Sequence, residues 1–192
     1  MQKGSRRESI IGTAAQIADE KGAAFVTMKE LAGRLGIRSP SLYKHFSGGL
    51  EELNRELMLY GWRLMDEEIT KAVIGKERDD AVIALCRAYR SFVCEHRGLY
   101  EAMQWYNMYL SEEHLQASEK AVEIMFRALS SYGLAEEQKV HCVRMMRAFM
   151  HGFSSIESHS AYGNPVPLDE SFDFALKTML EGISCLKKDN EL

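Results

Sequence analysis

Proline is nearly absent from this chain, and its placement is the strongest constraint on the fold. Among the 192 residues the only prolines are Pro40, Pro165 and Pro167. Because proline lacks a backbone N–H and interrupts helix interiors, long proline-free stretches permit long helices. These stretches are rich in helix-forming residues and do not show the alternation of apolar and polar residues that is typical of strands. The sequence therefore predicts an all-α protein.

Apolar residues spaced by three and four, together with glycines and capping residues, predict about nine helices. Thr27, with Glu30 three residues later, has the pattern of a capping box. Ser39 and Pro40 suit the cap and the first helical position of the next helix, and Gly36 separates these two helices. The expected helices span residues 5–22, 27–36, 39–46, 50–73, 78–96, 98–109, 112–132, 136–161 and 169–187.

A short helix, a glycine-containing turn and a second short helix are the elements of a helix-turn-helix, whose second helix enters the major groove of DNA. The second helix lies in the stretch IRSPSLYKHF, residues 37–46. Its Ile37, Leu42 and Phe46 suit inward packing, which leaves polar and basic residues on the other side. Arg and Lys bind guanine edges or phosphates, and Ser and Tyr hydroxyls bind phosphates. The candidate DNA-contacting residues are Arg6, Thr27, Met28, Lys29, Arg38, Ser39, Pro40, Ser41, Tyr43, Lys44 and His45.

Charge is distributed unevenly along the chain. Residues 1–46 hold eight basic and four acidic side chains, a net charge of +4, whereas the whole chain carries −4. A basic N-terminal part on an acidic body favours a polyanion partner for that part alone. The leading pair Arg6-Arg7 suits contacts with phosphates or with the minor groove. The alternative is a solvated polar face on a small helical bundle, because the helix-turn-helix pattern by itself is not specific.

Residues 6–60 resemble the N-terminal domain of the TetR/AcrR family of bacterial transcriptional repressors. The resemblance is carried by IIGTAAQIADEKGAAFVTMKELAGRLGIRSPSLYKHF. It implies a three-helix DNA-binding domain, here residues 1–49, and a larger helical effector-binding and dimerisation domain, here residues 50–192. It also implies a homodimer that binds double-stranded operator DNA and is released by a small, mostly apolar effector. One departure is Gly49, where many members carry a lysine that contacts a phosphate.

The C-terminal part resembles the subgroup of this family that carries a His-Gly dipeptide in its penultimate helix. His151-Gly152 lies in MRAFMHGFSSIESHSAYGNPVPLDESFDFALKTMLEGI, and HRGLYEAMQW occurs earlier in the chain. This match is looser than the first. It indicates an architecture and not a compound, because the C-terminal domains of the family diverge with their ligands.

Methionine and aromatic residues gather at residues 100–109 and 145–153 of this larger domain. Such side chains line adaptable apolar pockets, although most of them suit an ordinary core equally well. The candidate effector-binding residues are Tyr89, Phe92, Met103, Trp105, Tyr106, Met125, Met146, Phe149 and Phe153. The last two long helices are apolar on more than one side, which predicts that a second subunit covers one of these sides. The candidate dimerisation residues are Val140, Val143, Phe172, Ala175, Leu176, Met179, Leu180 and Ile183.

Several functional classes find no support in the sequence. The patterns G-x-G-x-x-G, G-x-S-x-G, P-loop and H-E-x-x-H do not occur, so an enzyme is not expected. The cysteines are far apart and form no C-x-x-C pair, so neither a metal site nor a cofactor is expected. No segment has the composition of a signal peptide or of a membrane span, so we expect a soluble, cytoplasmic protein without a membrane partner. The alternative function is a helical small-molecule, redox-sensing or metal-sensing protein that acts without direct operator binding.

Overall fold

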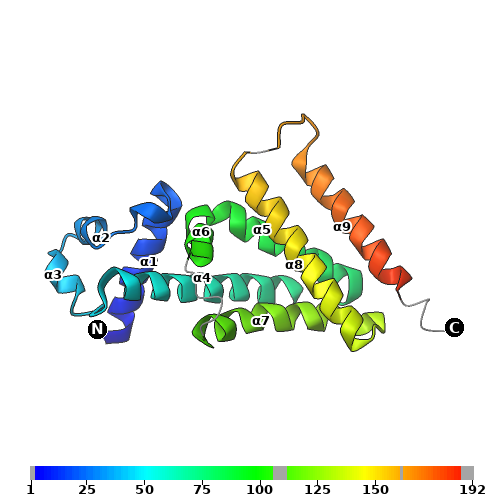
Figure 1. The fold of residues 1–192 in the computed structure, drawn as a ribbon, viewed down its shortest axis with the longest axis horizontal. Helices are drawn as coiled ribbons and strands as arrows, with labels where there is room; N and C mark the ends of the chain where they lie inside the picture. The colour runs from blue at the N-terminus through cyan, green and yellow to red at the C-terminus, as the bar shows by residue number, and fades with distance from the viewer. Residues whose placement is uncertain (1–2, 106–111, 161, 187–192) are drawn as a thin grey trace. The chain divides into compact units, whose positions relative to one another are not determined.

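The computed structural model describes residues 3–105, 112–160 and 162–186, and within these ranges the fold is all-α, as the sequence predicts (Figure 1). Residues 106–109, predicted to end the helix over 98–109, lie outside the described residues. The described chain forms α1 (Lys3–Lys21), the 3-10 helix η1 (Ala23–Phe25), α2 (Met28–Arg34), α3 (Ser39–Leu42), α4 (Gly49–Val73), α5 (Arg78–Glu95), α6 (Arg97–Trp105), α7 (Glu112–Ala128), the 3-10 helix η2 (Ser130–Tyr132), α8 (Glu136–Ser158) and α9 (Leu168–Cys185).

Helix α3 differs from the prediction in its N-cap residue and in its end. This helix begins with Arg38 at the N-cap position, so Ser39 is the first helical residue and not the cap, and Pro40 is the second. It ends at Leu42 instead of Phe46. The chain continues from there in a turn, in which the Phe46 N–H donates a hydrogen bond to the Leu42 carbonyl over 2.9 Å. The helix is therefore a single turn, extended by a hydrogen-bonded turn.

Packing divides the chain into two compact units. Helix α4 contributes to both, because the boundary falls between Met65 and Asp66. This division reflects contacts, whereas the predicted division into 1–49 and 50–192 concerns function and stays a prediction. The first unit contains Met1–Met65 and Glu95–Ser118, and the second unit contains Asp66–Cys94 and Glu119–Leu192.

In the first unit, α6 packs on the backbone of α1. Gly98 near the start of α6 permits this approach, because a Cβ added there would lie 1.8 Å from the Ala18 carbonyl oxygen. Beside it, the Asp19 carboxylate accepts a hydrogen bond from the Leu99 N–H over 2.8 Å and contacts His96 Nδ1 at 3.0 Å. Asp19 therefore satisfies an N–H at the N-terminus of α6 from a different helix.

In the second unit, the buried residues of α5, α8 and α9 are apolar except for Ser154 of α8, and Arg90 of α5 is half-buried. Two nitrogen atoms of Arg90 donate to the two carboxylate oxygens of Glu157 over 2.6 and 2.7 Å, and a third contacts Asp169 at 2.8 Å. The guanidinium also lies 5.5 Å from the ring centre of Phe153 and 4.8 Å from that of Phe172. One arginine of α5 thus holds α8 and α9 together, because charge-assisted bidentate contacts fix both distance and orientation.

The turn between α2 and α3 is a Schellman motif centred on Gly36, which has a φ of 64°. The Gly36 N–H donates to the Gly33 carbonyl over 3.2 Å, and the Ile37 N–H donates to the Ala32 carbonyl over 3.0 Å. Side chains other than glycine are strained at such a positive φ. The direction in which α3 leaves α2 therefore depends on a glycine, which stands where the sequence predicts the end of the first of these two helices.

Replacing Gly36 by alanine should lower the free energy of unfolding by roughly 1–2 kcal/mol, because a Cβ is strained in the left-handed conformation. Gly33 offers a matched control inside α2, since a Cβ added there meets nothing within 4 Å. Gly33→Ala should raise the free energy of unfolding by about 0.5–1 kcal/mol. Urea denaturation followed by circular dichroism measures both, and effects of the same sign would contradict the assigned turn.

Candidate functional site

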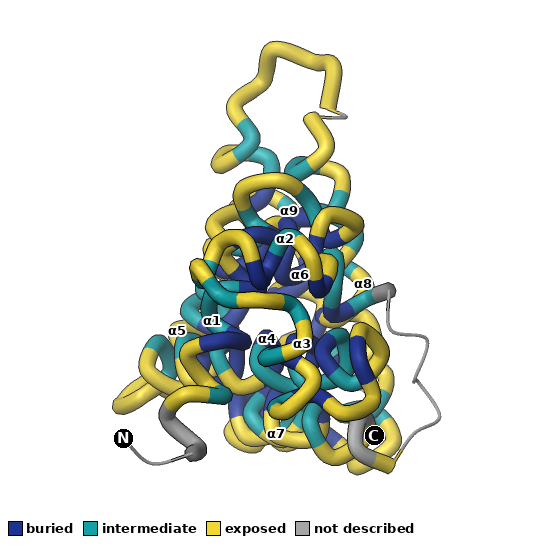
Figure 2. The backbone as a smooth tube through the Cα atoms, turned by 90° about the vertical axis from the view of Figure 1, so that its left-hand side faces the viewer, coloured by how far each residue is buried: buried dark blue, intermediate teal, exposed yellow. Residues whose placement is uncertain are grey.

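The segment formed by α3 and the following turn, residues 38–46 and hereafter the recognition segment, exposes most of its polar side chains. Leu42 and Phe46 are fully buried and anchor it through its apolar side. Figure 2 shows the backbone of α3 as exposed or half-buried over most of its length. The predicted DNA-contacting residues in this segment are the exposed Arg38, Pro40, Tyr43 and Lys44 and the half-buried Ser39, Ser41 and His45.

The start of α2 holds three further predicted DNA contacts. Thr27 caps this helix, as predicted, because its hydroxyl oxygen accepts a hydrogen bond from the Glu30 N–H over 3.1 Å. The Glu30 carboxylate forms an ion pair with Lys21 at 2.6 Å. Thr27 and Lys29 are exposed, whereas Met28 is only 8% exposed. The side chain of Met28 is therefore part of the core in this structure.

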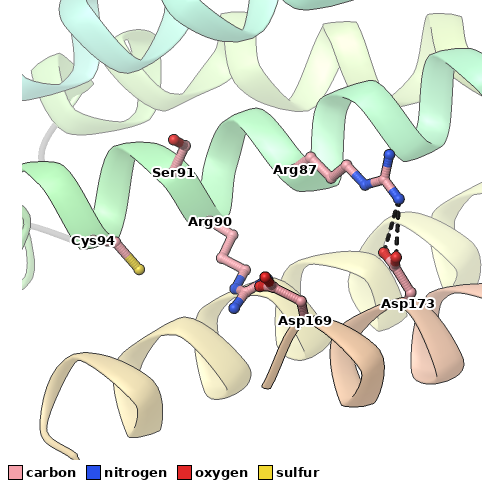
Figure 3. Close-up of a pocket in the computed structure, with 6 residues that line it drawn as sticks. All are labelled: Arg87, Arg90, Ser91, Cys94, Asp169 and Asp173. Atoms are coloured by element: carbon pink, nitrogen blue, oxygen red, sulfur yellow. Dashed lines mark hydrogen bonds and ion pairs between the residues drawn. The ribbon is translucent and has the colours of Figure 1, made fainter. Parts of the chain in front are cut away.

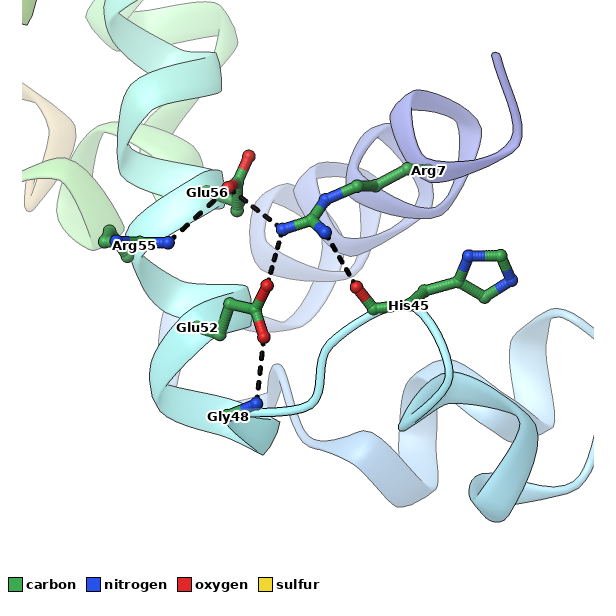
Figure 4. Close-up of polar contacts among 6 residues, drawn as sticks. All are labelled: Arg7, His45, Gly48, Glu52, Arg55 and Glu56. Atoms are coloured by element: carbon green, nitrogen blue, oxygen red, sulfur yellow. Dashed lines mark hydrogen bonds and ion pairs between the residues drawn. The ribbon is translucent and has the colours of Figure 1, made fainter. Parts of the chain in front are cut away.

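Arg7 holds the recognition segment in place. In the sequence the pair Arg6-Arg7 suits contacts with phosphates or the minor groove, but the structure places Arg7 within α1, where its guanidinium donates to the His45 carbonyl over 2.8 Å. The same side chain donates to the carboxylates of Glu52 over 2.7 Å and Glu56 over 3.0 Å, both in α4 (Figure 4). It also lies 4.8 Å from the ring centre of Phe46. Arg7 thus fastens the end of the recognition segment to two helices.

The start of α4 belongs to the same network (Figure 4). The Gly48 N–H donates to Glu52 Oε2 over 2.9 Å. This hydrogen bond, with the neighbouring Arg7 guanidinium, lowers the pKa of the Glu52 carboxyl below its usual value. Gly49 has a φ of 67°, and a Cβ there would lie 3.4 Å from Cε1 of Tyr43. The position that carries a lysine in many members of the family that this sequence resembles therefore favours glycine here.

The predicted effector-binding residues divide between the two units. In the first unit Met103 is buried on α6, and a Cβ added at Gly61 would lie 2.6 Å from the Met103 sulfur. The side chain of Trp105 and the whole of Tyr106 lie outside the described part of the chain. In the second unit the candidates are the buried Tyr89, Phe92, Met125 and Met146 and the half-buried Phe149 and Phe153.

A cavity of 430 Å³ lies beside α5 and the start of α9 in the second unit, and Figure 3 shows its charged lining. Arg87 pairs with Asp173 at 2.9 Å, and Arg90 pairs with Asp169. An anionic ligand would have to displace these carboxylates. The cavity is therefore poorly suited to anions, although two arginines line it. Its described lining consists of Arg87, Arg90, Ser91, Cys94, Asp169 and Asp173.

The predicted dimerisation residues are largely covered by their own unit. Val143, Phe172, Leu176, Met179, Leu180 and Ile183 are buried, and Val140 and Ala175 are half-buried. Other apolar side chains of the same two helices are exposed. They are Met145, Ala148 and Ile156 on α8 and Phe174 on α9, and Phe174 is 75% exposed.

Asp66 is a buried acidic residue that is not among the candidate site residues predicted from the sequence. It lies in α4 on the buried row of Trp62, Met65 and Ile69, and only 9% of it is exposed. Its Oδ1 atom has no hydrogen-bond partner among the described residues. Burial raises the pKa of this carboxyl to about 6, and Lys120 opposes the rise. The sequence does contain a signal for this residue, because Asp66 lies four residues after Trp62 and three before Ile69 and therefore on the apolar side of a predicted helix.

The ionisation of Asp66 affects stability in a definite direction. Its pKa in the folded chain, about 6, lies above the ordinary value of 3.8. The stabilisation that this group contributes is therefore complete at low pH and is lost as the pH rises through about 6. At neutral pH the folded chain holds a buried carboxylate whose Oδ1 accepts no hydrogen bond from the described residues, which is an unfavourable state.

Metal, membrane and thiol chemistry find little support in the described residues. Within them no three His, Cys, Asp or Glu side chains gather as a metal site would require. The described helices include none with the length and apolarity needed to cross a membrane. Burial raises the pKa of the Cys86 thiol to about 12 and also raises that of Cys142. Reactive cysteines have lowered pKa values, so these two thiols have the character of core residues.

Two protein families match the sequence. Residues 10–54 match the family described as bacterial regulatory proteins, tetR family. Residues 82–179 match the family described as the tetracyclin repressor-like C-terminal domain. The first match contains α2, α3 and the Schellman turn between them, and the second contains most of α5, α8 and α9.

Two regulators resemble the chain over most of its length. The HTH-type transcriptional regulator YobS of Bacillus subtilis is 29% identical over 182 residues, which cover 94% of this chain and 93% of YobS. The HTH-type transcriptional regulator Rv0681 of Mycobacterium tuberculosis is 35% identical over 155 residues, which cover 79% of this chain and 69% of Rv0681.

Solved structures share the fold. A protein of unknown function from Rhodococcus sp. RHA1 aligns with a TM-score of 0.77 at 20% identity, covering 92% of this chain and 93% of that one. A TetR variant, Q116A, from Acinetobacter baumannii, solved in complex with minocycline, aligns with a TM-score of 0.70 at 20% identity, covering 97% and 98% of the two chains. At these identities the likeness shows a shared fold alone.

The neighbours Arg6 and Arg7 should respond differently to the same substitution. Arg7→Met should lower the free energy of unfolding by about 1–3 kcal/mol, because two carboxylates and a carbonyl lose their charged donor. Arg6 is exposed, so Arg6→Met should change it by less than about 0.5 kcal/mol. Urea denaturation of both variants measures the difference. A loss of stability in Arg6→Met equal to that in Arg7→Met would contradict the role assigned to Arg7.

Proposed function

Because the chain belongs to the TetR family of bacterial HTH-type transcriptional regulators, we propose that it binds an inverted-repeat operator as a homodimer and is released by a small, mostly apolar effector. The regulators of this family are not enzymes, and neither is this chain. The observation that carries the operator proposal is the recognition segment, which exposes basic and hydroxyl side chains over the fully buried Leu42 and Phe46.

Within the recognition segment, side chains divide by what they reach on DNA. Arg38, Ser39, Pro40 and Ser41 lie at the start of α3, the part of a recognition helix that meets base edges. Tyr43 and Lys44 follow on the exposed turn and are proposed to contact phosphates, together with Thr27 at the start of α2. We also propose phosphate contacts for Arg6 and Lys29, and we assign the buried Met28 to supporting α2.

The homodimer is proposed to form through α8 and α9. On α8 the exposed Met145, Ala148 and Ile156 follow one side of the helix, at intervals of three and eight residues. Phe174 of α9 is exposed in the same way. Two copies of such a surface form an isologous interface, in which each apolar stripe covers the other. The buried residues named from the sequence would then support this surface from beneath.

Effector binding is proposed to act through α4. This helix starts directly after the recognition segment and ends at Val73 in the second unit, so its displacement would move the recognition segment. A ligand shifts the DNA-binding population only as far as its affinity differs between the two states. The A. baumannii variant solved with minocycline supports a ligand site in this fold. Membership of the His-Gly subgroup and action in the cytoplasm, where bacterial DNA lies, are part of the proposal.

Selection from a random pool of double-stranded DNA should return an inverted repeat with half-sites about 34 Å, or one helical turn, apart. Lys44→Ala should weaken binding to all sequences alike and reduce the slope of log affinity against log salt by roughly one unit, because one phosphate contact is lost. Titrations of the selected site and of a scrambled site at several salt concentrations measure this slope.

Arg38→Ala is the matched comparison, because this side chain is proposed to read a base. It should relax the preference at one base pair in a repeated selection. If Lys44→Ala relaxed a single base pair instead, the two roles would have to be exchanged. A pool that returned no enriched site would support the alternative of a helical sensor without direct operator binding.

Phe174→Glu should raise the dimer dissociation constant at least about 100-fold, because each subunit loses a large buried apolar side chain at the interface. Phe25→Glu is the matched control, since Phe25 is also exposed but lies in η1. Sedimentation velocity over a range of protein concentrations measures both. A dimer that withstands Phe174→Glu would place the interface elsewhere.

A further inference from the structure

We infer that Asp66 holds the positively charged head of the effector, so that the effector is a lipophilic amine or another lipophilic cation. This inference rests on the proposed function, because it assumes that a small molecule binds the chain. The property that carries it is a buried carboxylate oxygen for which the described chain offers no donor.

The surroundings of Asp66 along α4 are apolar. Met65 and Ile69 are fully buried, and Trp62 is nearly so. Asp66 continues this row at helical spacing and is itself more than nine-tenths buried. A carboxylate in such a place is unfavourable unless it is paired with a charge or hydrogen-bonded. A buried carboxylate oxygen without a hydrogen bond is an exception among folded proteins, and a binding role would explain it.

The described chain does not supply a strong partner for this carboxylate. Lys120 of α7 is the cation whose charge acts on Asp66, but Lys120 is exposed, and its effect is smaller than the effect of burial. Lysine side chains keep their charged end in water where they can. A ligand that brings its own cationic donor would satisfy Oδ1 without drawing Lys120 inward. With the pKa of Asp66 at about 6, the carboxylate is present at neutral pH to receive it.

Anionic and neutral effectors fit the second unit less well. Arg87 and Arg90 already pair with Asp173, Glu157 and Asp169, so these arginines are not available to an anion. A neutral apolar molecule would leave Oδ1 of Asp66 unsatisfied. An ammonium or amidinium head would satisfy the carboxylate, and an apolar body would suit the buried Met65 and Ile69 on the same side of α4.

The test uses three probes with the same chain and different heads: n-octylamine, n-octanol and octanoate. Each is titrated by calorimetry at neutral pH into the full chain and into Asp66→Asn, which keeps the shape of the side chain and removes its charge. The wild-type chain should bind octylamine at least about tenfold more tightly than octanol, because a charge-assisted hydrogen bond to a buried partner is added. Octanoate should bind more weakly than octanol. In Asp66→Asn the preference for the amine should fall below about twofold, with octanol affinity unchanged.

Two control variants separate a specific role from a general loss of negative charge or polarity. Glu67→Gln removes an exposed acid next to Asp66, and Ser154→Ala removes another buried polar group without a hydrogen-bond partner among the described residues. Both should keep the full amine preference. Circular dichroism establishes that each variant is folded. Asp66→Ser serves as a second charge-removing variant and should lose the preference as Asp66→Asn does.

The possible results of these titrations support or exclude the role of Asp66 as follows. Equal affinities of octylamine and octanol in the wild-type chain, or an amine preference that survives in Asp66→Asn and Asp66→Ser, would overturn the role of Asp66. Binding of none of the three probes would overturn it as well. Titration of the selected operator in the presence of the probes tests the proposed function separately. An amine that binds through Asp66 but leaves operator affinity unchanged would remove the proposed release while the site stands. If octanol but not octylamine released the chain from the operator, regulation by an effector would be supported and the proposed cation site at Asp66 would be excluded.

Discussion

The contact of α6 with the backbone of α1 is the constraint on which the first unit depends. Gly98 carries no side chain at the one point where a Cβ would collide with the Ala18 carbonyl, and Asp19 receives the Leu99 N–H directly beside it. Close packing and a satisfied helix end therefore coincide at one place. A substitution that separated α1 from α6 would therefore remove the close packing at Gly98 and the hydrogen bond from Leu99 to Asp19 together. Helix α6 is thus fixed to α1, the helix that contains Arg7.

Arg7 connects α1 to the recognition segment by hydrogen bonds. A one-turn helix has little stability of its own, because nucleation fixes several residues for few hydrogen bonds. The buried Leu42 and Phe46 hold α3 from beneath, and Arg7 holds the following turn through the His45 carbonyl. The carboxylates of Glu52 and Glu56 keep the guanidinium in position. The polar side chains that are proposed to contact DNA therefore lie on a segment that is held at its middle by Leu42 and at its end by Phe46 and Arg7.

Helix α4 connects the two proposed activities of the chain. It begins at Gly49, shortly after the recognition segment ends, and it includes Asp66 in the second unit. A ligand that neutralises a buried carboxylate in α4 gains free energy in the state where that carboxylate is buried, and it biases the population toward that state. Pairing between Asp66 and a cationic ligand would thus make the ligand bind one state of the chain more tightly than the other, as regulation requires.

The sequence by itself determined what depends on neighbours in the chain. The all-α fold, the cap at Thr27 and the turn at Gly36 follow from spacing, capping and a positive φ, which act over only a few residues. Tertiary structure alone decided which side chains are covered. Arg7 contacts residues 38 to 49 positions away, Asp66 Oδ1 has no hydrogen-bond partner among the described residues, and Phe174 is a large apolar side chain that α9 leaves exposed. Burial depends on what packs from distant parts of the chain, and a helical pattern shows only that a face is apolar, not which element covers it.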